Sequence, residues 1–207
     1  MKKIILTALT FGLLINSFSQ TDKKKLPAFA IHFFFNDFKT AEQIRTTGIV
    51  DVFRTKNWKR TNQMNPGLAL SYLEGLSNHV DLIGTLSGSF VEYPIPGKDN
   101  ASNNKFLLEA AGVVNLKLLT DHYFISPYLS IGAGISKWGG YYGAFIPAGI
   151  GLQVKLFDEV ALLINSQYRM PVTENVAYHL YHSIGFAGNL FKRKMEDPAQ
   201  LPSPPTP

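Results

Sequence analysis

The residues in this sequence that most resemble catalytic groups are His182 and Ser183, which are adjacent near the C-terminal end of the chain. A serine nucleophile needs a base within hydrogen-bonding distance, and histidine often takes that role. Both residues fall in a segment with strand-like alternation, where successive side chains point to opposite faces. Without a bulge they cannot form a dyad, so we predict no catalytic site here.

Metal and cofactor chemistry has equally little support. The same parity separates His179 from His182, and no other histidine pair has the spacing of metal ligands. Gly132-Ala133-Gly134 and Gly149-Ile150-Gly151 look like phosphate-binding glycines, but such loops follow a strand and open a helix. These glycines lie inside alternating segments, where we expect them to make room for large interior side chains. We predict neither a metal site nor a cofactor.

The N-terminus has the organisation of a secretory signal peptide. Lys2 and Lys3 precede an apolar run from residue 4 to residue 15, which is shorter than the roughly 20 apolar residues that a transmembrane helix needs. Ser17 and Ser19 then offer small side chains just before a cleavage ahead of Gln20. We predict a signal peptide at residues 1–19 and a short segment at 20–27. The chain has no cysteine, which excludes a lipid-modified lipoprotein and a disulfide framework.

The charge is modest and unevenly distributed. The formal charge of +5 falls to +3 once Lys2 and Lys3 are removed, and much of the remaining excess lies between residues 39 and 63. An exported protein is not expected to bind nucleic acid, so we predict no such partner. Glycine (17 residues), aromatic residues (13%) and a mean hydropathy near zero are typical of a barrel with one face toward lipid and the other toward a polar interior.

From residue 28 onward the dominant pattern is alternation of apolar and polar residues. In the clearest segment, residues 160–170, the two faces separate cleanly apart from Leu163. One face carries Val160, Leu162, Ile164, Tyr168 and Met170, and the other carries Ala161, Asn165, Gln167 and Arg169. A strand places successive side chains on opposite sides, so this pattern predicts an apolar-out, polar-in strand.

Eight segments follow this rule, at residues 28–37, 65–74, 80–93, 106–118, 128–136, 142–156, 160–170 and 176–191. We expect a bulge or kink at Pro147 and some helix in the long loop 38–64, where Thr40 and Gln43 suggest a capping box. No later stretch is apolar enough for a transmembrane helix, and a sheet in lipid must close on itself. We predict an all-β protein, an eight-stranded antiparallel transmembrane up-and-down β-barrel at residues 28–191 with both termini periplasmic.

The predicted barrel resembles the N-terminal domain of OmpA-family outer-membrane proteins. The likeness rests on residues 65–92, on residues 126–176 and on a last strand ending at Phe191. In that family a periplasmic peptidoglycan-binding domain follows, whereas here sixteen residues follow Phe191, and residues 192–207 form a proline-rich tail. The resemblance implies an outer-membrane barrel delivered by the barrel-assembly machinery, although Gly188 departs from the usual closing-strand signal. It does not support peptidoglycan contact.

The alternation of side chains along the strands places a set of charged and polar residues on the inward face. They are His32, Asp81, Glu109, Lys117, Lys155, Arg169 and His179. A barrel of eight strands leaves an interior just wide enough for side chains to fill. The lumen ion-pair candidates are Glu109, Lys117, Lys155 and Arg169, with either Lys117 or Arg169 as the partner of Glu109. We therefore expect a filled lumen without a continuous aqueous channel.

Aromatic residues near the strand ends suit the two interfacial girdles of a membrane barrel. They are Tyr93, Tyr123, Phe124, Trp138, Tyr141, Tyr142, Phe157, Tyr178 and Phe191. In the basic first loop, Lys56, Lys59 and Arg60 are candidates for contact with lipopolysaccharide phosphates. The sequence thus favours a non-enzymatic integral outer-membrane barrel with an envelope-stabilising or surface-presenting role. The alternatives are a small-solute pore or transporter and an envelope enzyme such as a lipid A deacylase.

Overall fold

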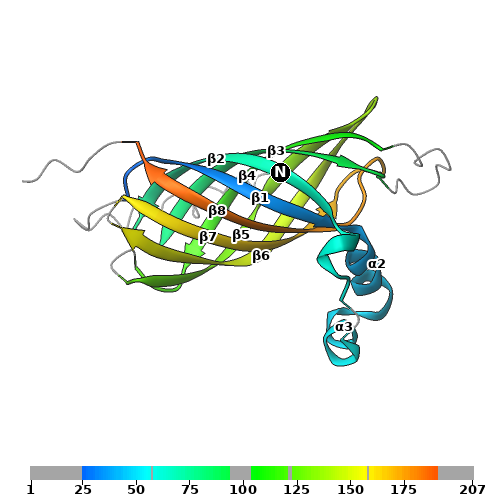
Figure 1. Cartoon of the computed structure of the whole chain (residues 1–207), viewed down its shortest axis with the longest axis horizontal. Helices are drawn as coiled ribbons and strands as arrows, with labels where there is room; N and C mark the ends of the chain where they lie inside the picture. The colour runs from blue at the N-terminus through cyan, green and yellow to red at the C-terminus, as the bar shows by residue number, and fades with distance from the viewer. Residues whose placement is uncertain (1–24, 57, 94–103, 121–122, 158, 191–207) are drawn as a thin grey trace, which may run out of the picture.

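The computed structural model describes residues 25–56, 58–93, 104–120, 123–157 and 159–190. The predicted signal peptide and the proline-rich tail lie outside the described residues. Eight strands form one sheet, in the order β1 (Ala28–Asp37), β2 (Asn65–Ser77), β3 (Val80–Val91), β4 (Lys105–Lys117), β5 (Ile125–Trp138), β6 (Tyr141–Phe157), β7 (Val160–Pro171) and β8 (His179–Asn189). Each strand pairs antiparallel with the next, and β1 pairs with β8, so the barrel is closed (Figure 1). The predicted fold class is confirmed.

The two ends of the barrel differ. At one end, here called the termini end, β1 begins and β8 finishes, and the connections between strands are short. At the other, here called the helix end, the β1–β2 connection carries α2 (Phe38–Thr47), α3 (Ile49–Thr55) and a short 3-10 turn, η2 (Thr61–Gln63) (Figure 1). The β5–β6 connection at this end is a two-residue turn. There Gly139 has a φ of +56°, a backbone conformation that glycine adopts without strain.

Strand parity holds all around the barrel. Large apolar side chains are exposed on the outer wall, among them Phe29, Ile31, Leu68, Leu86, Ile135, Ile150 and Phe186. An outward apolar belt of this extent suits a hydrocarbon environment rather than water. Among the described residues, no helix has the length and apolar character required to cross a bilayer.

The interior is not uniformly polar. Leu163, which interrupts the alternation of β7, keeps its inward parity and is buried with Ala28, Ala30, Leu73 and Ala187. This apolar layer lies toward the termini end. Leu163 therefore follows the geometry of the strand and departs only from the expectation of a polar lumen.

Two glycines make room for rings, as the sequence analysis expected. A Cβ atom on Gly151 would overlap the ring of Tyr128, and one on Gly134 would overlap the ring of Phe145. Gly132 and Gly149 instead face neighbouring backbone at close approach. All four positions need glycine because the interior is narrow.

Several predicted details are wrong. Of the bulge or kink expected at Pro147, the bulge is absent: the pairing of β6 with β5 lapses locally there but resumes in the same register, and the bulge in β6 lies between Lys155 and Phe157. The last strand begins at His179 rather than at residue 176. The preceding residues Val176 and Ala177 instead pack into the mouth of the barrel.

The helix in the first loop begins earlier than predicted. Asp37 caps α2, accepting a hydrogen bond of 2.9 Å from the Thr40 backbone N–H, so the predicted capping box of Thr40 with Gln43 does not form the cap. Gly48 then separates α2 from α3 with a φ of +92°. The helical segment of the loop is therefore divided into two helices at this glycine.

Candidate functional site

The main charged group of the lumen lies toward the helix end. Glu109 on β4 accepts a charge-assisted hydrogen bond from Arg169 on β7, and their side chains are only 2% and 1% exposed. These strands are not neighbours, so the ion pair crosses the interior of the barrel. Because each charge is removed from water, each depends on the other for solvation.

His179 and two aromatic rings complete this group. The His179 Nε2 atom lies 3.4 Å from the second oxygen of Glu109, and its Nδ1 atom bonds the Ala177 carbonyl oxygen at 3.0 Å. A carbonyl can only accept, so Nδ1 is the donor, and Nε2 also donates if the ring carries both protons. The Arg169 guanidinium lies 3.8 Å from the ring centre of Tyr181 and 5.1 Å from that of Phe145. Cation–π attraction therefore supports the arginine on two sides.

A second buried ion pair lies toward the termini end. The Lys117 Nζ atom donates to Asp81 at 2.9 Å, and the Lys25 Nζ atom lies 3.9 Å from the other Asp81 oxygen. Lys25 also donates to Gln153 at 2.9 Å. Lys117 is eight residues from Glu109 along β4, roughly 26 Å of strand, which excludes it as the partner of that carboxylate.

The remaining predicted lumen residues are also placed by the structure. Lys155 is half-buried at the termini end, far from Glu109 and beside the bulge in β6. His32 is buried midway and lines a cavity of about 30 Å³ together with Tyr128, Asn165 and Arg169. Such a cavity has room for about one water molecule and none for a solute.

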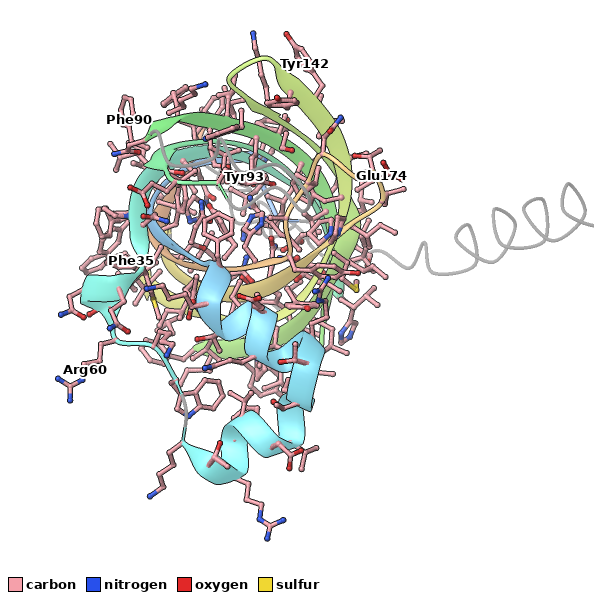
Figure 2. All side chains as sticks on the ribbon, turned by 90° about the vertical axis from the view of Figure 1, so that its right-hand side faces the viewer. Phe35, Arg60, Phe90, Tyr93, Tyr142 and Glu174 are labelled. Atoms are coloured by element: carbon pink, nitrogen blue, oxygen red, sulfur yellow. The ribbon has the colours of Figure 1, made fainter. Side chains whose placement is uncertain are left out.

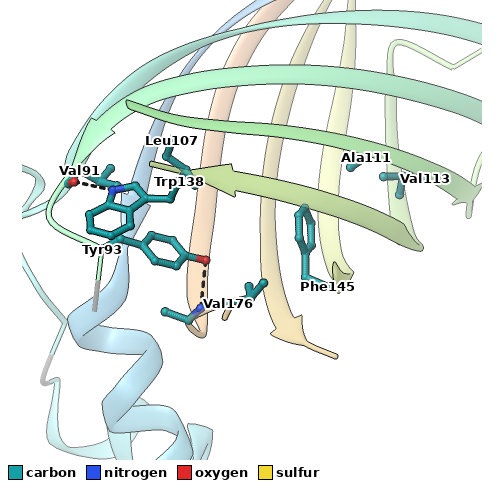
Figure 3. Packing of buried hydrophobic residues seen from close by; sticks show 9 residues of the cluster. Val91, Tyr93, Leu107, Ala111, Val113, Trp138, Phe145 and Val176 are labelled. Carbon is teal, nitrogen blue, oxygen red and sulfur yellow. Dashed lines mark hydrogen bonds between the residues drawn. The ribbon is translucent and has the colours of Figure 1, made fainter. Parts of the chain in front are cut away.

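An aromatic cap of Tyr93 and Trp138 packs next to the Glu109 group, with the Tyr93 ring centre 6.4 Å from that of His179. Figure 3 shows the two rings and their hydrogen bonds. Tyr93 and Trp138 stack with ring centres 5.8 Å apart and are 1% and 3% exposed. The Trp138 Nε1 atom donates to the Val91 carbonyl oxygen at 3.1 Å, and the Tyr93 hydroxyl oxygen accepts from the Ala177 N–H at 3.0 Å. Viewed from the helix end, Tyr93 lies inside the ring of strands (Figure 2). Burial, together with the nearby Glu109 carboxylate, raises the pKa of the Tyr93 phenol, which stays neutral.

The prediction that all of these aromatic residues belong to the interfacial girdles is wrong in part. Tyr123, Phe124, Tyr142 and Phe157 are exposed on the outer surface, as interfacial aromatics require, and Tyr178 is partly covered. Tyr141 is paired with Trp138 between β5 and β6, shares its inward face and stacks on its ring, with ring centres 6.2 Å apart. Tyr93 and Trp138 instead turn inward. For Trp138 the signal was available in the parity of β5, since it shares a face with Ser136 and Gly134. Phe191 lies outside the described residues.

His182 and Ser183 lie on opposite faces, with Ser183 buried inside. His182 instead bonds Ser166 on the outer wall, at 2.9 Å between Nδ1 and Oγ, and the two residues are directly paired between β7 and β8. Sequence reasoning missed this contact because it depends on register. Ser166 lies inside a ladder paired on both sides, where the backbone N–H groups bond neighbouring strands rather than point to a substrate. Within the described part of the chain, no three histidine, aspartate or glutamate side chains gather as metal ligands would.

The predicted basic loop residues lie on the rim at the helix end. Lys56 and Arg60 are exposed, and Lys59 is half-buried, with its backbone N–H donating to Thr40 at 3.2 Å. Lys56 ends α3 in a left-handed conformation with a φ of 52°.

Comparison with known proteins identifies the fold. No family model matches the chain, and no curated protein sequence matches it. Among solved structures, neisserial surface protein A has a TM-score of 0.53 at 11% identity, covering 81% of this chain and 99% of that one. The outer-membrane protein OprG of Pseudomonas aeruginosa has a TM-score of 0.52 at 8% identity, covering 80% and 97%.

The chain has the fold of a small outer-membrane β-barrel. The architecture implied by its resemblance to OmpA-family N-terminal barrels is confirmed at the level of the fold. The apolar belt of the barrel is therefore its lipid-facing surface, and the ion pairs of Glu109 and Asp81 lie in its lumen.

Proposed function

We propose that this protein is a non-enzymatic integral barrel of the Gram-negative outer membrane, with a structural or surface-presenting role. The observation that carries the proposal is the packed lumen at the helix end. There the Glu109–Arg169 pair crosses the interior beneath the cap of Tyr93 and Trp138. A protein that conducts solutes needs a continuous polar passage, and this interior is filled by side chains.

The proposal includes an orientation and a set of partners. Both termini are periplasmic and the helix end faces outward, because an even number of strands returns the chain to its starting side. Lys56, Lys59 and Arg60 would then face the phosphates of lipopolysaccharide. The barrel-assembly machinery is the expected partner during biogenesis, and contact with peptidoglycan is not proposed.

Fractionation and conductance test the proposal together. Cell fractionation should recover the protein in the outer membrane, with gel mobility that differs between boiled and unboiled samples. Purified protein in planar bilayers should show no large, steady conductance. Recovery as a soluble periplasmic protein would end the membrane assignment, whereas a stable open channel would favour the pore.

The enzyme alternative has its own test, because the described residues include a serine–histidine hydrogen bond, between Ser166 and His182. We expect purified wild-type protein to release no acyl chain from lipid A or phospholipid. Release that disappears in Ser166→Ala would replace the structural role with a catalytic one.

A further inference from the structure

The β1–β2 connection begins at the mouth of the barrel, where the Phe38 ring packs against Tyr93 and His179, and the rest of it folds against the outside. We call residues 38–60 the helical arm. The hydroxyl of Tyr168, a residue on the outer face of β7, donates to the Ala41 carbonyl oxygen at 3.4 Å. The Arg45 guanidinium lies 5.5 Å from the ring centre of Tyr178. Seen along the barrel from the helix end, α2 crosses the edge of the ring of strands and α3 lies beyond it (Figure 2).

The helical arm extends sideways from the barrel, in the direction that the membrane plane would take around a spanning barrel. In Figure 1 the arm extends to one side of the long axis of the barrel, next to the end of β1. The lipid-facing belt continues to that point through Phe33 and Phe35, whose rings meet edge to face with centres 5.0 Å apart. The arm therefore lies where the apolar belt of the barrel ends.

The α3 helix presents apolar side chains to solvent at this level. Ile49, Val50 and Phe53 are 54%, 72% and 60% exposed, while Val52 is buried at 2%. Trp58 is 43% exposed, and its ring centre lies 4.4 Å from that of Phe53. Residues four apart on a helix share a face, so Ile49 and Phe53 lie on one side, with Val50 beside them. Tryptophan and phenylalanine beside a headgroup layer are typical of interfacial helices.

The charges of the arm fit the same environment. Arg54, Lys56 and Arg60 are exposed around the apolar face, and Lys59 is half-buried beside it. The acidic residues between positions 38 and 60 are Glu42 and Asp51. Interfacial helices combine an apolar face in the acyl boundary with lysine and arginine at the phosphates.

We propose that the exposed face of α3, with Ile49, Val50, Phe53 and Trp58, is inserted in the interfacial layer of the membrane that the barrel spans. The arm then acts as a lateral anchor that fixes the depth and rotation of the barrel in lipid. The inference rests on the proposed membrane location. It adds an apolar contact to the phosphate contact proposed for the basic residues.

Tryptophan fluorescence tests the anchor, because the chain contains two tryptophans and Trp138 is buried in the lumen. The protein is refolded into vesicles of phosphatidylcholine and phosphatidylglycerol, with or without bromine on the acyl chains near the headgroups. In Trp138→Phe, we expect Trp58 to emit at a shorter wavelength than tryptophan in water does, and its emission to be quenched by the brominated lipid. In Trp58→Phe, most of the quenching of the wild type should be lost, which keeps the test valid if Trp138→Phe folds poorly.

Three further variants assign the contact to the apolar face. The double variant Val50→Ser/Phe53→Ser should reduce quenching of Trp58, whereas Val172→Ser, an exposed apolar residue of another loop at the same end, should not. Replacing Lys56, Lys59 and Arg60 with glutamine should leave most of the quenching in place. Heat-modifiable mobility of every sample shows separately that the barrel is folded and inserted. Water-like emission of Trp58 with no bromine quenching, in a barrel with that mobility, would overturn the anchor while leaving the membrane location intact.

Discussion

The two buried ion pairs of the lumen have similar chemistry but different surroundings. Glu109 and Arg169 join β4 to β7 across the barrel, with aromatic rings on the guanidinium and the Tyr93–Trp138 cap above. Asp81 and Lys117 join the adjacent strands β3 and β4, and Lys25 lies near the same carboxylate. The first pair connects opposite walls of the barrel, whereas the second reinforces a contact that the strand ladder already makes.

This difference predicts unequal consequences when each pair is broken. A buried charge that loses its partner keeps the cost of its desolvation. Among the described residues, Glu109 would retain the His179 ring at 3.4 Å, whereas Asp81 would retain Lys25, an ammonium group at 3.9 Å. The cross-barrel pair should therefore be the more sensitive of the two.

The largest effect is expected from Arg169→Ala. Removing the guanidinium leaves the Glu109 carboxylate buried at 2% exposure, and breaking a buried pair in this way costs about 3–5 kcal/mol. The free energy of unfolding in urea, followed by gel mobility after refolding into vesicles, measures the loss. Arg60→Ala on the exposed rim is the control and should change it by less than about 0.5 kcal/mol. Equal stability of the two variants would show that the cross-barrel pair is not an important support.

The double variant Glu109→Gln/Arg169→Met sharpens the comparison. Neither buried charge remains, so the double variant should be less destabilised than Arg169→Ala by about 1–3 kcal/mol. The same unfolding measurement on Glu109→Gln, on Arg169→Met and on the double variant completes the cycle. Additive losses would contradict a direct coupling between the two side chains.

Lys117→Met should have a smaller effect, about 1–3 kcal/mol, because Lys25 remains beside Asp81 and because methionine keeps the apolar stem of lysine. Adding Lys25→Met should increase the loss, since both ammonium groups near Asp81 are then gone. Urea unfolding of the single and double variants tests this. If Lys117→Met were as destabilised as Arg169→Ala, the second ammonium group would offer Asp81 no compensation.

The smallest effect is expected at the rim. Replacing Lys56, Lys59 and Arg60 with glutamine should leave the free energy of unfolding within about 0.5 kcal/mol of wild type, because the side chains of an exposed loop add little to barrel packing. Binding of lipopolysaccharide micelles should weaken in the same variant, and wild-type binding should fall as salt is added. Loss of assembly would show that this loop supports the fold, and unchanged binding would remove it as a phosphate contact.

Alternation in the sequence was sufficient to predict the strands and the inward side of each one. Glu109, Arg169 and His179 could be assigned to the lumen because a strand has a side-chain period of two residues, whatever its partners. The choice of partner for Glu109 could not be predicted, because it depends on how far each strand is shifted along its neighbours. The hydrogen bond between Ser166 and His182 was missed for the same reason.

The aromatic residues show the same division. Tyr142 and Phe157 were recognised as interfacial from their place near strand ends, and the structure leaves both exposed. Tyr93 was assigned to the same girdle, yet it continues the inward parity of Ser89 and Val91 just beyond β3 and is buried over the lumen. As for Trp138, the alternation of the strand indicated the inward direction, and the position near a strand end was the wrong guide.

By itself, the sequence determined the number of strands, the closure of the sheet and the two faces of its wall. These properties follow from local composition and from a short repeat along the chain. Only the tertiary structure decided that Arg169 rather than Lys117 meets Glu109, that Tyr93 and Trp138 cap the lumen, and that α3 projects beside the barrel. Each of these depends on distances between segments that are far apart in sequence, and strand register and barrel curvature set those distances.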